Sequence, residues 1–174
     1  MKYFYVMLLC LGSGCSMNKL YLHPDALDRT LTQTEVYDYD TKQTMTVALG
    51  DHFQPTFYDS LQQPIEFDYS IESIEFKNEK DKLLNGWFIT PKKSISNTIT
   101  LFYLHGNAGN IYSQYSLMLP FVKKGFSVFM IDYSGFGYSE GKAKRKNVYS
   151  DALFAFEYLK TRTDVLNHRI IVYG

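Results

Sequence analysis

Residues 98–110 are TITLFYLHGNAGN, and residues 126–141 are FSVFMIDYSGFGYSEG. Each stretch starts with a dense run of β-branched, aromatic and other apolar residues, which is typical of a strand buried on both faces of a sheet. Each run then passes directly into a glycine-rich turn. Because ligands of open α/β sheets bind in the crevice at the carboxyl ends of the strands, both turns are candidate parts of a functional site.

The segments after these strands alternate between helix and strand. Residues 111–124 have a helix-like pattern that Gly125 closes, and Pro120 inside it predicts a kink or an early end. Residues 147–162 predict the clearest helix, and residues 169–173, RIIVY, predict a last buried strand. The apolar face of the second helix is formed by Val148, Ala152, Ala155, Phe156 and Leu159. This alternation indicates an α/β protein with a mostly parallel sheet flanked by helices.

The part of the chain before these strands is patterned less regularly. Residues 71–76 and 83–90 predict two strands joined by a charged turn, so a β-hairpin precedes the parallel part and makes the sheet mixed. The residues before this hairpin contain a possible strand at 44–49 and no motif. We therefore expect an N-terminal arm over residues 15–70 that wraps a domain formed by residues 71–174.

The composition excludes several classes of protein. The chain has 174 residues, 18 basic and 18 acidic side chains and 45% apolar residues, with 15 Tyr, 13 Phe and 1 Trp. A chain so rich in aromatic residues is not a disordered tail. The neutral total argues against nucleic acid as a partner, because a nucleic-acid-binding protein needs a basic face to neutralise phosphates. The length suffices for the core of one domain.

The start of the chain has the layout of a secretory signal. Lys2 follows the initiator methionine, residues 3–11 form an apolar run too short to span a membrane, and small residues precede Cys15. Small residues directly before a cysteine resemble the bacterial lipoprotein box, although Gly12 stands where that family favours leucine. The resemblance implies a signal peptide over residues 1–14, lipidation of Cys15 and a membrane-anchored protein of the cell envelope. An ordinary cleaved signal and a buried apolar start are the alternatives.

The runs YLHGNAGN at 103–110 and DYSGFGYSEG at 132–141 resemble the serine-aminopeptidase-like branch of the α/β-hydrolase superfamily, which includes membrane-anchored bacterial hydrolases. The resemblance covers the domain predicted above and implies the N-terminal part of an α/β-hydrolase fold. In that family the His-Gly turn supplies half of the oxyanion hole, through the backbone N–H of the residue after the glycine. Carried over, that donor is Asn107, and His105 and Gly106 shape the turn.

The nucleophile of that family lies in a Gly-x-Ser-x-Gly elbow after the next strand, which is RIIVYG at 169–174 in this sequence. Gly174 matches the first glycine of the elbow, and the sequence stops there. The serine belongs two positions further on, and the acid and the histidine come later still. The resemblance therefore leaves the chain with no catalytic residue at a matching position. We expect a truncated hydrolase domain that is inactive alone.

A second match to the elbow pattern lies at 137–141, GYSEG, and Asp164 and His168 follow it in the required order. Ser139 is not assigned as the nucleophile, because an elbow holds its serine within about two residues of the strand end, and Ser139 lies well past Asp132. Asp164 and His168 lead into a strand, so they are expected at the end of the sheet opposite the catalytic rim.

Two hypotheses about function follow. The first is the N-terminal part of an exported serine hydrolase, whose complete form cleaves an ester, thioester or amide substrate through an acyl-enzyme. The alternative is a non-catalytic or decayed membrane-anchored lipoprotein that uses the half-fold for binding. We predict no cofactor and no metal site, because His23 and His52 lack partners at ligand spacing and no Lys-Ser/Thr pair follows the His-Gly turn as in a phosphate loop.

Overall fold

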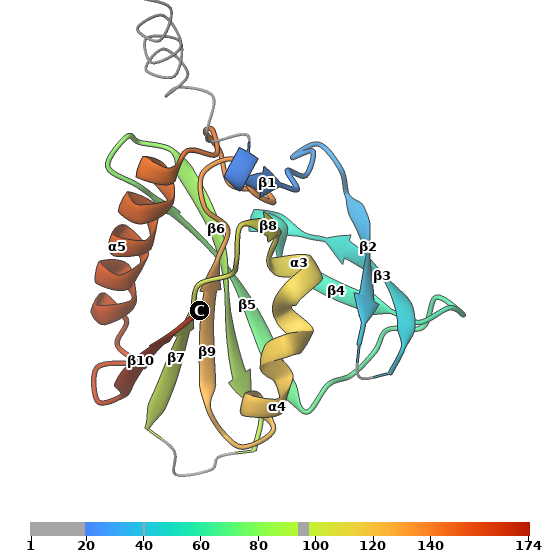
Figure 1. Cartoon of the computed structure of the whole chain (residues 1–174). Coiled ribbons are helices and arrows are strands. Elements are labelled where there is room, and N and C mark those ends of the chain that lie inside the picture. The colour runs from blue at the N-terminus through green and yellow to red at the C-terminus, as the bar shows by residue number, and fades with distance from the viewer. Residues whose placement is uncertain (1–19, 40, 94–97) are drawn as a thin grey trace, which may run out of the picture.

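The computed structural model describes residues 20–39, 41–93 and 98–174. Its centre is a five-stranded sheet with the strand order β10-β7-β9-β6-β5 (Figure 1). The strands are β5 (Tyr69–Lys77), β6 (Leu83–Pro91), β7 (Ile99–Tyr103), β9 (Ser127–Ile131) and β10 (Arg169–Tyr173). β7 pairs in parallel with β10 and β9, whereas β6 pairs antiparallel with β9 and β5. The predicted α/β class, with a β-hairpin ahead of a parallel part, is confirmed.

The central strands are the apolar runs that the sequence singled out. Every residue of β9 is buried, as are all residues of β7 except the first. A continuous apolar run predicts burial on both faces, because successive side chains point to opposite faces of the sheet and all of them are apolar. The hairpin is longer than expected, since its ladder extends from the Tyr69–Pro91 pair to the Lys77–Leu83 pair.

The segment predicted as a helix over 111–124, with a kink or an early end at Pro120, is helical but broken, and its last helix ends at Val122. It contains α3 (Ile111–Gln114), a 3-10 turn η2 (Tyr115–Met118) and α4 (Leu119–Val122). Pro120 lies in the first turn of α4. A proline is tolerated there because its missing N–H has no intrahelical partner to lose, whereas it would disrupt the middle of a longer helix. Gly125 ends the segment with a φ of 91°.

The second helix is confirmed with shifted ends. α5 runs over Arg145–Thr161, so it starts two residues earlier and ends one residue earlier than the predicted 147–162. Its predicted apolar face points at the sheet. Ala155 and Leu159 are fully buried, and Val148, Ala152 and Phe156 pack partly buried against the same cluster.

The predicted arm is folded onto the domain. It contains β1 (His23–Pro24), β2 (Gln33–Asp38), β3 (Gln43–Leu49), the short 3-10 turn η1 (Asp51–Phe53) and β4 (Pro55–Tyr58). β2, β3 and β4 form a separate antiparallel sheet, and β1 pairs in parallel with β8 (Ala108–Gly109). The possible strand predicted at 44–49 is β3.

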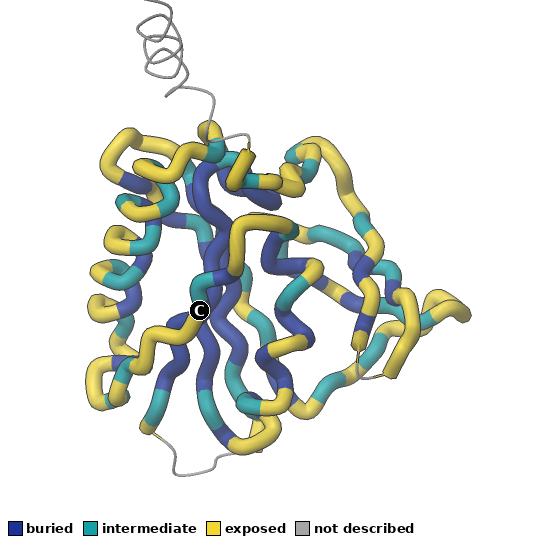
Figure 2. Tube along the Cα trace, in the orientation of Figure 1, coloured by how far each residue is buried: buried dark blue, intermediate teal, exposed yellow. Residues whose placement is uncertain are grey.

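Two apolar clusters cover the two faces of the central sheet, whose inner strands β7, β9 and β6 are mostly buried in Figure 2. One cluster contains Trp87 of β6 and joins the sheet to α3, α4 and the three-stranded sheet. The other contains Phe88 and joins the opposite face to α5. Adjacent residues of a strand point to opposite faces, so β6 contributes to both clusters. The strand ends are thereby held rigidly between two packed layers.

The signal-like segment and Cys15 lie outside the described residues. Within residues 20–39, 41–93 and 98–174, no helix is long and apolar enough to cross a membrane. The described chain begins at Leu20, beside β1 and at the carboxyl end of the parallel strands (top of Figure 1).

Candidate functional site

Two glycine-rich segments lie side by side at one edge of the sheet. We call them the His-Gly turn (residues 105–109) and the Asp132 loop (residues 132–141). β7 and β9 are adjacent and parallel, with Tyr103 paired to Met130, so both strands end at the same edge (Figure 1). The turn follows β7 and the loop follows β9. The sheet topology therefore brings together the two segments that the sequence predicted as parts of a site.

A buried carboxylate joins the turn to the loop. Asp132 and His105 are both buried, and Asp132 Oδ1 lies 3.6 Å from His105 Nε2. The same oxygen accepts a hydrogen bond of 2.9 Å from the backbone N–H of Ile111, the first residue of α3. Burial raises the pKa of Asp132, and the neighbouring imidazole of His105 opposes the rise. Asp132 thus fixes the start of α3 against the turn.

The side chain of His105 lies inside the protein beneath the turn. Its ring contacts Tyr133 and Phe136, with ring centroids 4.6 Å and 5.2 Å apart. The hydroxyl of Tyr133 also donates a hydrogen bond of 3.0 Å to the His105 carbonyl. The contribution of His105 is therefore to hold the conformation of the turn, and its side chain is closed to solvent.

The backbone at Gly106 and Asn107 faces outward. Both residues are exposed, and a Cβ at Gly106 would meet no atom within 4 Å. The Asn107 carbonyl accepts a hydrogen bond of 2.8 Å from the N–H of His23, and the Asn107 side chain donates one of 2.7 Å to the carbonyl of Tyr21. Among the described residues, the backbone N–H of Asn107 donates no hydrogen bond. Because Asn107 is exposed, this N–H is a candidate donor to a ligand at the carboxyl end of β7.

Gly174 lies against the start of the His-Gly turn. β10 is in register with β7, with Tyr173 opposite Tyr103, and the Leu104 N–H donates a hydrogen bond of 2.9 Å to the Tyr173 carbonyl. An ideal Cβ at Gly174 would lie 2.6 Å from the carbonyl oxygen of Leu104. Only glycine fits so close an approach of two backbones. The end of β10 therefore lies beside the turn that presents Asn107.

A segment without any sequence motif crosses both parts of the site. We call residues 20–29 the N-terminal strap. The Gly137 N–H donates a hydrogen bond of 2.9 Å to the Asp25 carbonyl, and the Leu27 N–H donates one of 2.8 Å to the Gly137 carbonyl. The Asn110 side chain donates to Asp25 as well. Sequence reasoning missed the strap because its partners are distant in the chain and no local periodicity marks it.

Ser139 has a structural role. It is buried, its hydroxyl donates a hydrogen bond of 2.6 Å to the Asp132 carbonyl, and it accepts one of 2.8 Å from the N–H of Asn85. Asp164 and His168 precede β10 at the opposite edge of the sheet, where His168 contacts the start of β7. Ser139, Asp164 and His168, which the second elbow match would require as a triad, are therefore not brought together.

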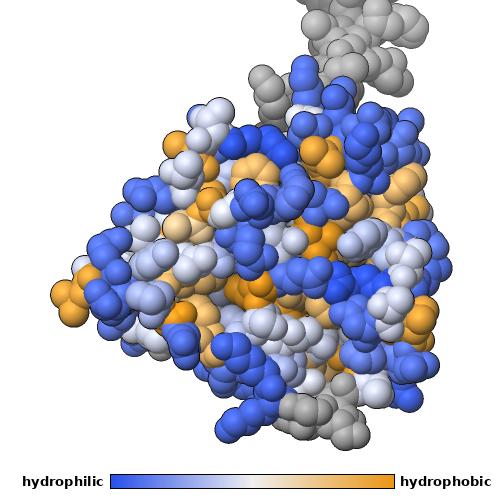
Figure 3. Space-filling view, turned by 180° about the vertical axis from the view of Figure 1, so that it is seen from behind, coloured by the Kyte–Doolittle hydropathy of each residue, from blue (hydrophilic) through white to orange (hydrophobic). Residues whose placement is uncertain are grey.

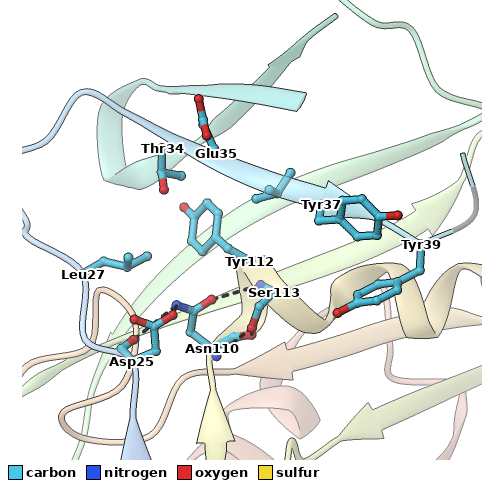
Figure 4. A pocket seen from close by; sticks show the side chains of 10 residues that line it. Asp25, Leu27, Thr34, Glu35, Tyr37, Tyr39, Asn110, Tyr112 and Ser113 are labelled. Atoms are coloured by element: carbon cyan, nitrogen blue, oxygen red, sulfur yellow. Dashed lines mark hydrogen bonds between the residues drawn. The ribbon is translucent and has the colours of Figure 1, made fainter. Parts of the chain in front are cut away.

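A cavity of about 180 Å³ opens between the strap, β2 and α3 (Figure 4). Asn110 lies at its edge, where it accepts a hydrogen bond from the Ser113 N–H and donates to Asp25, so its polar atoms cap α3 and hold the strap. The remaining lining residues include Leu27, Thr34, Glu35, Tyr37, Tyr39 and Tyr112. Across the described part of the chain, no three His, Cys, Asp or Glu residues are grouped so as to hold a metal ion.

Comparison with known proteins agrees with this geometry. The sequence profile of the alpha/beta hydrolase fold matches residues 99–171, which run from β7 into β10. This part of the chain therefore has the fold of the α/β-hydrolase superfamily. Its relative YfhR of Escherichia coli K12, an uncharacterised protein, is 35% identical over 108 residues, which are 61% of this chain and 38% of YfhR. The chain therefore spans well under half the length of this curated relative.

Solved structures of hydrolases share the fold. An alpha-beta hydrolase from Vibrio vulnificus has a TM-score of 0.51 at 25% identity, over 60% of this chain and 35% of that protein. An esterase from Pyrococcus furiosus has a TM-score of 0.50 at 23% identity, over 60% of this chain and 41% of the esterase. The resemblance inferred from the sequence is confirmed for the α/β-hydrolase fold.

Proposed function

We propose that this chain supplies part of the active site of a serine hydrolase that cleaves ester, thioester or amide bonds. The observation that carries the proposal is the exposed Asn107 just past the end of β7, whose N–H has no acceptor among the described residues, beside Gly174 at the end of β10. A backbone donor held in a fixed turn is suited to stabilising negative charge on a carbonyl oxygen, since it needs no reorganisation when that charge develops.

The nucleophilic serine is proposed to lie two positions past Gly174 in the whole protein. In a Gly-x-Ser-x-Gly elbow the second donor of the oxyanion hole is the N–H of the residue after the serine. Two donors from neighbouring strand ends would then converge on one oxygen. The serine hydroxyl attacks the carbonyl carbon, a histidine takes its proton, and the oxygen of the tetrahedral intermediate takes the negative charge. Because the histidine and the acid also follow the elbow, residues 1–174 alone are proposed to be inactive.

Export and membrane anchoring belong to the same proposal. The small residues before Cys15 and the short apolar run at 3–11 support cleavage before Cys15 and its lipidation. In bacteria expressing the protein, we expect a radioactive fatty acid to label it and Cys15→Ser to abolish the label. An unlabelled wild-type protein would remove the lipid anchor from the proposal.

The function is tested by deleting the single backbone donor in the whole protein. Asn107→Pro removes the N–H and is expected to lower kcat for a p-nitrophenyl ester by about 10²- to 10³-fold, as for other oxyanion-hole donors. Asn107→Ala is the matched control, because it removes the side chain but keeps the N–H, and its kcat should stay near the wild-type value. Thermal unfolding of both variants verifies that the fold is intact.

Equal kcat values for Asn107→Pro and Asn107→Ala would contradict the role of this donor. If the whole protein hydrolyses no ester, thioester or amide, the alternative of a non-catalytic, membrane-anchored lipoprotein is favoured instead.

A further inference from the structure

Five lysines surround a cavity of about 530 Å³ at the carboxyl edge of the sheet. They come from three segments, namely the β5–β6 turn, the chain after the Asp132 loop and the N-terminus of α5. We call them the lysine rim, and its members are Lys80, Lys82, Lys142, Lys144 and Lys146. All five residues are exposed. The rim is formed only by folding, because its first and last members are far apart in the sequence.

The N-terminus of α5 adds partial positive charge at the mouth of this cavity. Asn78 and Ser134 line its floor, and both donate to the buried Asp151, at 2.8 Å from the Asn78 side chain and at 2.7 Å from the Ser134 N–H. α5 begins here with no side-chain hydrogen bond at its N-cap, Lys144, and with no acidic residue in its first turn. The N–H groups at a helix N-terminus carry partial positive charge. They add to the charge of the lysines.

Two of the acidic side chains near the rim are engaged in local contacts, whereas Glu79 in the β5–β6 turn is exposed beside Lys80. Asp81 is paired with Lys77 at 2.7 Å, and the Glu140 carboxylate accepts a hydrogen bond of 3.2 Å from the N–H of Leu83. Asp151 is wholly buried under the cavity. The chain as a whole has 18 basic and 18 acidic side chains, so the rim gives a neutral protein one positively charged end.

We propose that the lysine rim docks the protein onto a membrane surface that carries anionic phospholipid headgroups. Lysines next to such a surface are attracted by its negative potential. All five lysines are exposed, which suits a broad charged surface better than an enclosed site for one soluble phosphate. Hydrophilic residues also cover most of this end of the molecule when it is seen from behind (Figure 3).

The position of the first described residues supports a membrane as the partner. This inference rests on the proposed anchoring at Cys15, because the strap that follows the anchor lies beside the rim: Leu22, Pro24 and Lys142 line one pocket. Tyr21 in the strap and Tyr149 near the start of α5 are 47% and 70% exposed. Tyrosines of this kind favour the boundary between water and lipid, since their rings are amphipathic. Anchor, tyrosines and lysines would face one surface together.

The test is co-sedimentation of the full chain with vesicles. Cys15→Ser is introduced so that no lipid is attached, and the vesicles are phosphatidylcholine with and without phosphatidylglycerol. The rim variant is Lys142→Gln, Lys144→Gln and Lys146→Gln. The control variant is Lys92→Gln, Lys93→Gln and Lys124→Gln, which removes the same charge from exposed residues at the opposite end of the molecule. Circular dichroism verifies that both variants are folded.

We expect binding to require phosphatidylglycerol. The rim variant should lower the partition coefficient roughly 100-fold, since each lysine near an anionic surface contributes about fivefold. The control variant should lower it less than about twofold, because charges farther away than a Debye length are screened. Phosphatidylcholine vesicles measure what the apolar start of the chain contributes by itself.

Three results would overturn the proposal: no dependence on phosphatidylglycerol, equal losses in the rim and control variants, or inorganic phosphate that binds the rim tightly in a calorimeter while vesicles do not. The last result would assign the cavity to a soluble anion. None of these measurements involves hydrolysis or lipidation. Failure here therefore leaves the hydrolase proposal standing, and failure of fatty-acid labelling leaves the vesicle result unchanged.

Discussion

A glycine is required at position 137, because this residue lies directly against the buried side chain of Asp132. Its φ is 47°, and an ideal Cβ at this position would overlap Asp132 Oδ2. Gly137→Ala should therefore lower the free energy of unfolding by about 3 kcal/mol, from backbone strain and displacement of a buried carboxylate. Gly106→Ala is the control, because a Cβ there meets nothing within 4 Å, and its effect should stay within about 0.5 kcal/mol. Equal losses in urea unfolding would contradict this account of Gly137.

Asp132 should make stability depend on pH in a defined direction. Burial raises its pKa in the folded protein above the ordinary value of 3.8. A raised folded-state pKa gives stability that is present below pH 3.8 and lost as the pH rises through the folded-state value. Asp132→Asn removes this titration and keeps an acceptor for Ile111. The stability of the variant relative to wild type should therefore increase with pH above 3.8.

Asp28→Asn is the control, because its effect on stability should change with pH in the opposite direction. Hydrogen bonds from the backbone and side chain of Thr30 lower the pKa of Asp28 below 3.8, so its stabilising contribution is lost as the pH falls. Urea unfolding from pH 3 to pH 7 measures both variants. If the stability of Asp132→Asn relative to wild type fell with rising pH, the attraction between Asp132 and His105 would outweigh the cost of burying the carboxylate.

At the residue scale, the sequence predicts the residues of the site that directly follow a recognisable strand. His105, Gly106 and Asn107 follow a recognisable strand, so their place at its carboxyl end could be predicted. Asp132 could be placed at the end of a strand, but not opposite His105, because that contact depends on which strands are neighbours. The role of Asp25 could not be predicted from the sequence, because its hydrogen bonds with Asn110 and Gly137 join segments that are far apart in the chain.

Arg162 ties the end of α5 to the sheet. Its guanidinium donates to Glu72 at 2.7 Å and to Asp164 at 2.8 Å, and it lies 4.4 Å from the ring centroid of Phe88. Arg162→Ala should lower the free energy of unfolding by about 2 kcal/mol through lost charged hydrogen bonds and the cation–π contact. Lys160→Ala, which removes an exposed pair with Glu157, should cost less than about 1 kcal/mol.

The stabilising effect of Arg162 should also become smaller at low pH. Its hydrogen bonds hold the pKa of Asp164 below 3.8, so the contribution of this pair is present above pH 3.8 and is lost as the pH falls below it. Thermal unfolding of wild type and Arg162→Ala at pH 7 and pH 3 measures the change. A difference between the two proteins that is larger at pH 3 would contradict the pairing.

At the scale of elements, the strength of the local pattern decided what could be predicted. The buried runs of β7 and β9 and the apolar face of α5 are continuous, and all three are found. The helix expected at 111–124 is broken by η2, because its buried side chains, including Tyr115 and Met118, pack against the core in a tighter turn. The apolar pattern of this segment reports burial and not the helix type.

At the scale of the whole molecule, strand order and charge distribution emerge only from the fold. The net charge of the chain, which is zero, could not predict that lysines gather in the lysine rim. The order β10-β7-β9-β6-β5 places β10 at an edge, with Ile171, Val172 and Tyr173 from 41% to 56% exposed. The same order places the end of β10 beside the His-Gly turn. This proximity is the geometric basis of the proposed active site.

The most direct test is labelling with a fluorophosphonate, which reacts with activated serines, followed by mapping of the labelled peptide by mass spectrometry. Residues 1–174 alone should take no label. The whole protein should be labelled on a serine two positions past Gly174, and Ser139→Ala should leave that label in place as long as the protein folds. A label on Ser139, or on any other residue up to Gly174, would contradict the claim that this chain carries the oxyanion turn and not the nucleophile.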